Sequence, residues 1–279
     1  FKQKTAYEIR LSLVGSEMCI RDRPGTVKVN NLPSTYNTTD GLIASTTGYY
    51  VSLSNGAWSA QIWSLNNGVA TFIPNDGTAK AIVRHTITTS PGFSVAEIYF
   101  ASGGGTPQLD GTDSLTVTAS PNSLISSSGL NVTIAAPLNF GANPCTIEVN
   151  NGTLTASGIL SGTSSGVVTK SGTGTLTLGN PSNNFAGAVG INAGILSVAS
   201  NGALGTGNAI SLNGGTLQAT ASIAGIGRVI TVATPSSIDV PNAGHTVRVT
   251  SGLVATAILT KIGAGTLELT AAGSGAANT

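Results

Sequence analysis

Lys170-Ser-Gly-Thr-Gly174-Thr-Leu-Thr-Leu178 is a stretch in which a glycine-rich turn leads directly into alternating threonine and leucine. Successive side chains of a β-strand point to opposite faces, so the two leucines would lie on one face and the threonines on the other. The glycines suit a tight turn because they adopt positive φ without a steric clash. The stretch therefore predicts a corner followed by a short strand with one buried and one solvated face.

The same turn recurs along the chain and indicates a repeat. Gly-Thr-Leu begins at Gly152, Gly174, Gly215 and Gly265, with the near match Gly194-Ile-Leu196 between them. Units of roughly 20 residues are too small to bury their own apolar faces, so they must stack on one another. Stacking of short parallel strands gives a β-helix in which like residues lie above one another at about 4.8 Å. We expect such a ladder from Leu154, Leu176, Leu196 and Leu217.

Short alternating segments fill the intervals between these turns. Strands are expected at 115–117, 132–134, 147–149, 210–212, 229–232, 238–240 and 247–249, and the first coils at 69–72 and 82–88. Asparagine and glycine mark corners at 150–152, 192–194 and 213–215. The predicted fold is all-β, with a parallel β-helix (solenoid) over residues 68–279 and a less regular segment, residues 24–67, as an irregular N-terminal β cap over its open end.

The composition restricts the classes of partner. Only 8% of the 279 residues are charged, the formal net charge is +1, and the basic residues form no stripe. Neither a phosphate backbone nor an acidic membrane face would be strongly attracted, so we predict no nucleic-acid partner. No apolar run reaches the roughly 18 residues of a transmembrane helix, so no membrane-spanning segment is expected.

Residues 1–23 differ from the rest of the chain. They hold five of the twelve basic and three of the eleven acidic residues, and the only methionine. Lys2 to Ile9 resembles one reading frame of a sequencing primer, and Leu13 to Arg23 resembles a translated transposon end, so we interpret the segment as an adaptor-derived artefact and exclude it from the fold. The repeat pattern breaks off at the other end near 276–279, which predicts a fragment truncated at both ends.

The repeat carries a family resemblance. Lys170–Leu178, followed by Asn184-Phe-Ala-Gly187 and Val189-Gly-Ile-Asn-Ala-Gly194-Ile-Leu196, resembles the autotransporter-associated β-strand repeat, also called the passenger-associated transport repeat. The likeness covers the core 170–217, and Lys261-Ile-Gly-Ala-Gly265-Thr-Leu-Glu-Leu269 is similar to the opening of a partial copy at 261–279. Phe185 stands where tyrosine is usual and Ile195 replaces a threonine, and both keep strand character.

The resemblance implies an exported, right-handed β-helical passenger of a bacterial surface protein, whose repeats support export and folding. It would lie outside the cell or at the cell surface, associated with the outer membrane. The expected function is a structural stalk that supports secretion and display, in the manner of an adhesin. Surface glycans or a host or neighbouring cell surface are the partners this implies.

No constellation of residues indicates chemistry. His85 and His245 are far apart, and neither stands in a Ser-His-Asp arrangement or a metal-ligand spacing. Cys145 is a lone thiol after the N-terminal segment and is expected to be a small buried apolar residue. We predict no catalytic, cofactor-binding or metal-binding residue, no cofactor and no enzymatic activity.

Two alternatives involve carbohydrate. A polysaccharide-cleaving β-helix needs carboxylates that project together from neighbouring strands, and its candidates are Asp110, Asp113, Asp239 and Glu268. Asp110 and Asp113 could also bind calcium, but a polar turn explains them as simply, and two carboxylates make an incomplete shell. A binding module without turnover would use exposed aromatic side chains, with Tyr49, Tyr50, Trp58 and Trp63 as candidates.

Overall fold

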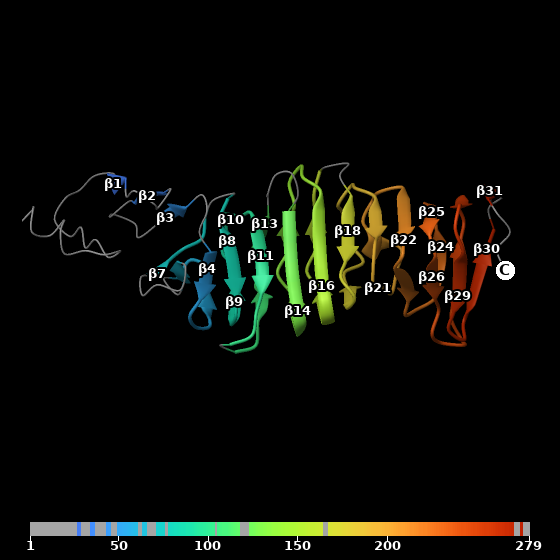
Figure 1. Ribbon diagram of the computed structural model, residues 1–279, viewed down its shortest axis with the longest axis horizontal. Helices are drawn as coiled ribbons and strands as arrows, with labels where there is room; N and C mark the ends of the chain where they lie inside the picture. Colours follow the sequence, from blue (N-terminus) through green and yellow to red (C-terminus); the bar gives the residue numbers. More distant parts are fainter. Residues whose placement is uncertain are drawn as a thin grey trace, which may run out of the picture.

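The computed structural model describes residues 27–28, 34–36, 43–45, 49–60, 63–65, 71–75, 78–103, 105–117, 123–163, 167–270 and 274–275. Within these ranges the chain forms short strands and one 3₁₀ turn, η1 (Gly202–Leu204). From β8 (Lys80–Val83) onward the coils lie across a long axis and follow one another along it in sequence order (Figure 1). The all-β prediction is confirmed. Residues 1–23 and the predicted boundary between 67 and 68 lie outside the described residues.

Two long parallel ladders run the length of the molecule. Side A consists, in order, of β4 (Tyr49–Ser52), β8 (Lys80–Val83), β11 (Glu97–Phe100), the first halves of β14 (Ser123–Ile134) and β16 (Cys145–Ala156), β18 (Val168–Ser171), β20 (Val189–Ile191), β22 (Ala209–Asn213), β25 (Val229–Thr234), β28 (Leu253–Ala255) and β31 (Ser274–Gly275). Each strand pairs in parallel with the next, as a solenoid requires.

Side B lies around the corner from side A. It consists of β5 (Gly56–Ala57), β9 (Thr86–Thr88), β12 (Gln108–Asp110), the second halves of β14 and β16, β19 (Thr175–Leu178), β21 (Ile195–Val198), β23 (Thr216–Ala219), β26 (Ser236–Asp239) and β29 (Leu259–Ile262). The long strands β14 and β16 therefore bend through the corner and belong to both sides.

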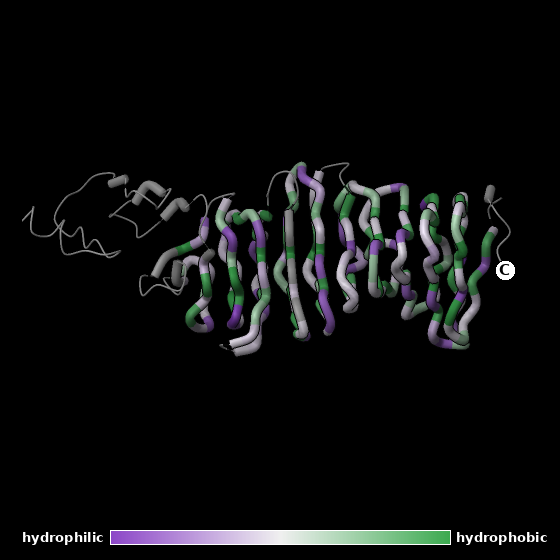
Figure 2. Tube along the Cα trace, viewed as in Figure 1, coloured by the Kyte–Doolittle hydropathy of each residue, from purple (hydrophilic) through white to green (hydrophobic). Residues whose placement is uncertain are grey.

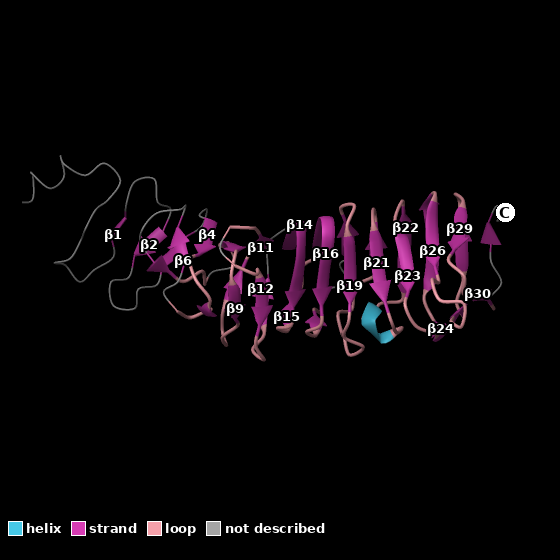
Figure 3. Ribbon diagram, turned by 90° about the horizontal axis from the view of Figure 1, so that it is seen from below, coloured by secondary structure: helices cyan, strands magenta, loops and turns pink. Residues whose placement is uncertain are grey.

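Shorter ladders complete the coils. One parallel ladder holds β10 (Ser94–Val95), β13 (Leu115–Val117), β15 (Leu138–Asn139) and β17 (Leu160–Ser161), and another holds β24 (Ile223–Ile226), β27 (Thr246–Val249) and β30 (Thr266–Leu269). The 3₁₀ turn η1, cyan in Figure 3, lies at the edge of the stack rather than in a ladder. All strands predicted from alternation between 115 and 249 are present.

The predicted leucine ladder is confirmed as a column inside side B. Its members pair in the order Val132, Leu154, Leu176, Leu196, Leu217 and Ile238. These side chains are at most 2% exposed, and each buried leucine of this kind contributes about 1.5–3 kcal/mol. Hydrophobic and hydrophilic residues alternate along the strands (Figure 2). On the strand Thr175–Leu178 the two leucines are buried and the two threonines are only partly buried, as expected.

The predicted corners have the expected backbone. Asn151 and Gly152 have φ of 60° and 78°, Gly194 has φ of 62° and Gly214 has φ of 108°. These left-handed values cost least for glycine and are tolerated by asparagine, which explains why the two residue types recur there. The repeated Asn-Gly signal in the sequence is therefore a signal of corners.

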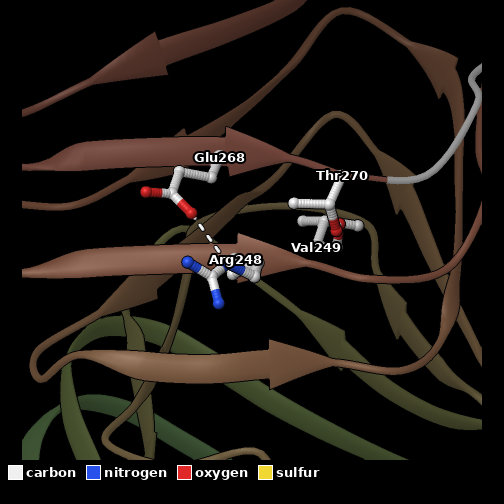
Figure 4. A network of polar contacts seen from close by, with 4 residues as sticks. All are labelled: Arg248, Val249, Glu268 and Thr270. Atoms are coloured by element: carbon white, nitrogen blue, oxygen red, sulfur yellow. Dashed lines mark hydrogen bonds and ion pairs between the residues drawn. The ribbon is translucent and has the colours of Figure 1, made fainter.

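Hydroxyl side chains reinforce the strand ends, a feature that the sequence did not indicate. At six positions the backbone N–H and the side-chain hydroxyl both donate to one carbonyl oxygen of the coil before: Ser157, Thr163, Thr206, Thr220, Thr256 and Thr270. Figure 4 shows Thr270, whose N and Oγ1 both lie 3.0 Å from the Val249 carbonyl oxygen. The second donor strengthens the contact between coils where the chain leaves the ladder.

At the N-terminal end of the stack, antiparallel strands stand where one of the first coils was predicted. β6 (Trp63–Leu65) pairs antiparallel with β4, and β7 (Thr71–Phe72) pairs antiparallel with β6. The expectation of a first coil at 69–72 is wrong for its described residues, because β4, not β7, is the parallel neighbour of β8. A terminal coil has a free strand edge, and here a returning strand pairs with it. β1 (Val27–Lys28), β2 (Ser34–Tyr36) and β3 (Ile43–Ser45) form a separate antiparallel sheet.

The leucine column yields a stability prediction. We expect Leu196→Ala to lower the free energy of unfolding by about 2–5 kcal/mol, because it removes a side chain packed between two leucines and leaves a cavity. The matched control is Ile195→Ala, which truncates the outward-facing neighbour on β21 and should cost clearly less. Urea denaturation followed by circular dichroism measures both. Equal losses for the two variants would contradict the assignment of this column to the core.

Candidate functional site

Asp110 and Asp113 lie in a turn that is held by its own neighbours. Thr89 Oγ1 donates to the backbone carbonyl oxygens of Asp110 and Asp113, at 3.1 and 2.7 Å. The Asp110 carboxylate accepts a hydrogen bond from Gln108 Nε2 at 2.5 Å. These contacts give the turn a structural explanation. That Asp110 and Asp113 have no catalytic role stays a prediction.

The other two candidate acids are bound elsewhere on the solenoid. Asp239, on β26, accepts a hydrogen bond from Gln218 Nε2 at 2.8 Å. Glu268, on β30, pairs with Arg248 of β27 at 2.7 Å between Oε2 and Nε (Figure 4). Asp110 lies on β12, several coils away from both, so the structure does not bring the four candidate acids together. Among the described residues no group of three or more His, Cys, Asp or Glu could hold a metal ion.

Three of the four aromatic candidates for glycan binding are core residues, and the carbohydrate-binding alternative is wrong for these three. Tyr50, Trp58 and Trp63 are fully buried, with the two indole rings 4.7 Å apart. Trp58 Nε1 donates to the Pro74 carbonyl oxygen at 2.8 Å and Trp63 Nε1 to that of Trp58 at 3.2 Å. Both large rings are therefore packed in the core with their N–H groups satisfied. The side chain of Tyr49 lies outside the described residues.

The histidines and the cysteine occupy unrelated positions. His85 Nδ1 lies 3.0 Å from Ser52 Oγ, and His245 precedes β27 at the far end of the stack. Cys145 is buried in side A, and burial raises the pKa of its thiol above the usual range, which makes it unreactive. No helix in the described part of the chain is long and apolar enough to cross a membrane.

The most unusual group in the structure is the buried Lys170. It stands between Ile147 and Ile191 in an apolar column of side A, and the residue is 1% exposed. Its ammonium Nζ lies 2.7 Å from the carbonyl oxygens of Ser171 and Gly172, and 3.2 Å from that of Ala193. A buried ammonium needs acceptors, and here the backbone of the glycine corner supplies them.

Burial lowers the pKa of Lys170 from its ordinary value to about 8, while the nearby Glu148 carboxylate acts in the opposite direction. The cause is the loss of hydration, which disfavours the charged form. The sequence could not reveal this environment, because a lysine beside a glycine turn usually faces solvent. The available clue was its spacing, since Lys170 falls on the inward face when the alternation is extended across the corner.

A second corner has the same construction. Lys261 Nζ lies 2.8 Å from the carbonyl oxygens of Ile262 and Gly263, its own two following residues. Gly172 and Gly263 both have positive φ, and a Cβ on either would lie 2.5 Å from an Oδ1 of the coil before, that of Asn150 or of Asp239. Lys261 is only partly buried, and within the described residues no strand pairs with β29 on its far side.

The two corners lie on different sides of the solenoid. The first joins β18 on side A to β19 on side B, whereas the second joins β29 on side B to β30 in the ladder with β24 and β27. Lys261 accordingly stands above Ile238, in the column that contains Leu196 and Leu217. The lysine-glycine motif therefore specifies a corner and an inward-facing position for the lysine just before that corner. It does not specify which side of the solenoid carries the corner.

Stacked parallel coils, apolar columns and lysine-bearing glycine corners define a parallel β-solenoid built from repeats. Within that class, the family model of the passenger-associated transport repeat matches residues 168–198 and 259–279. The chain carries this repeat at both lysine corners, as the sequence predicted; the stretch 199–217 of the predicted core lies outside the match. No curated protein and no solved structure matches the chain.

The buried lysine yields a pH prediction. Its folded-state pKa of about 8 lies below the ordinary value near 10.5, so between these pH values the unfolded chain binds this proton more tightly. The contribution of Lys170 to the free energy of unfolding is therefore constant below pH 8. It rises as the pH increases from about 8 to about 10.5. We expect wild type to gain stability relative to Lys170→Met between pH 7.5 and 10 in urea denaturation. A difference that is flat or falls with pH would contradict this environment of Lys170.

Proposed function

We propose that this chain is a structural passenger or stalk segment of an exported bacterial surface protein, and that it supports secretion and display. The observation that carries the proposal is the coincidence of the repeat matches with the two lysine corners of an extended parallel solenoid. In this proposal the solenoid is right-handed, residues 24–67 close its N-terminal end, and the protein lies outside the cell or at its surface, associated with the outer membrane.

The shape and surface support a mechanical rather than a chemical role. Coils stack along one axis, so each added coil lengthens the molecule without changing its cross-section (Figure 1). Few charged side chains decorate it, and the acids on β12, β26 and β30 are separated and bonded to protein groups. We therefore propose that the segment has no enzymatic activity and holds other parts of the protein away from the cell, where a glycan or a neighbouring cell is contacted.

The export role is tested by removing one coil at a time. The chain is placed between an export signal and a surface anchor in a Gram-negative host, and displayed protein is measured by protease accessibility on intact cells. Deletion of residues 175–194 removes a repeat coil and joins Gly174 to Ile195, the register partner of Thr175. We expect a several-fold loss of displayed protein, because this coil belongs to the matched repeat.

The matched control is deletion of residues 216–236, a coil outside the repeat match, which joins Gly215 to Ser237, the partner of Thr216. It shortens the solenoid by a similar length and should leave display closer to wild type. Undiminished display after loss of residues 175–194, or an equal loss for both deletions, would contradict a specific role of the repeat in export.

The absence of catalysis is tested separately. Purified chain, Asp110→Ala and Asp113→Ala are compared on a panel of plant, algal and bacterial polysaccharides, with reducing ends as the readout. We expect none of the three proteins to release reducing ends above background. Turnover by wild type that is lost in either variant would replace the stalk proposal with the carbohydrate-active alternative.

A further inference from the structure

The two repeat corners show one motif in two situations. At the first corner the following coil is in place, with β20 paired to β18 and β21 paired to β19. At the second corner β29 and β30 have no described strand paired on their far side. Within the described residues, the first repeat lysine thus has a following coil paired to its corner, and the second has none.

Covering the corner adds one specific contact. Both lysines donate to the two carbonyl oxygens that follow them in their own coil, at 2.7 Å for Lys170 and 2.8 Å for Lys261. Lys170 alone has a third acceptor within the described part of the chain, the carbonyl oxygen of Ala193 in the next coil, at 3.2 Å. The next coil therefore completes the hydrogen bonds of an ammonium group that its own coil has already positioned.

The next coil is shaped for this contact. Gly194 follows Ala193 with φ of 62°, and a Cβ on it would lie 2.9 Å from Lys170 Nζ and 2.5 Å from the Gly172 carbonyl oxygen. A side chain there would displace the ammonium or lift the coil. The glycine at this corner thus permits the close approach that brings the Ala193 carbonyl oxygen to the lysine.

We propose that the repeat lysine is a clamp between coils: it is held in place by its own corner, takes its third acceptor from the next coil to dock, and ties the two coils into one cooperatively opening block. The clamp concerns the folding of the solenoid and holds whether or not the chain is exported.

A clamp of this kind acts more strongly than an ordinary rung contact. The apolar contacts within a column are non-directional and tolerate small displacements of one coil against the next. A charged hydrogen bond, by contrast, is lost once donor and acceptor separate. If the upper coil lifts, the Ala193 carbonyl oxygen leaves the ammonium and the apolar column around Lys170 is opened at the same time. The coil that holds Lys170 and the coil after it should therefore open together.

The test is hydrogen exchange by mass spectrometry on the full chain. In Lys170→Met, which keeps an unbranched apolar side chain one atom shorter and removes the donor, we expect amides of residues 187–198 to exchange about tenfold faster than in wild type, from the loss of a charged hydrogen bond. Residues 146–156 should change less, because they remain paired with the coil below. Lys261→Met is the matched control and should leave residues 187–198 unchanged.

Unchanged exchange of residues 187–198 in Lys170→Met would overturn the clamp, and so would an equal acceleration throughout the chain, which would indicate general destabilisation. If Lys170→Met fails to fold, hydrogen exchange of the wild-type protein alone tests the clamp. In low urea, residues 168–178 and 187–198, the two coils that the clamp joins, should then show the same opening free energy and the same dependence on urea. Independent opening of the two coils would overturn the proposal, while the display experiment could still succeed.

Discussion

In-register parallel stacking is the constraint on which the whole structure depends. Each coil exposes apolar side chains that it cannot bury alone, and only a like residue of the next coil covers them. The column from Val132 to Ile238 shows this requirement met over six successive strands of side B. Because the chain must return to the same column after every turn, coil length, corner residues and strand length all follow from this single condition.

The corners are where the condition is hardest to meet. The backbone leaves one ladder and enters another, so carbonyl oxygens there lose their regular partners and need other donors. The ammonium of Lys170 supplies such a donor, and hydroxyls, as at Thr220 and Thr270, add a second donor to a carbonyl oxygen that keeps its rung bond. A polar group within an apolar column is tolerable at a corner because acceptors are concentrated there.

The sequence predicted the stacked strands, the leucine column and the glycine corners because these depend on alternation and on positive φ, which are local properties. It missed the environments of Lys170 and Trp58 because burial depends on which coil lies above or below. A tryptophan near the start of the chain looks the same whether it faces a glycan or closes the core, and the antiparallel return of β6 along β4 decided the matter. The sequence was enough to name the candidate acids. It did not show how far apart they lie along the axis, because that depends on how many coils separate β12, β26 and β30.

The shift of the repeat from one side of the solenoid to another shows what the motif encodes. Lys170 and Lys261 have different neighbours in the cross-section, yet each takes a position in an inward-facing column and donates to the two carbonyl oxygens that follow it. A motif selected for one face, such as a binding surface, would need to return to that face. One selected for the corner and for its contact with the next coil need not, because every corner of a solenoid offers the same geometry. The placement of the two copies therefore favours a role in joining coils over a role in presenting a surface.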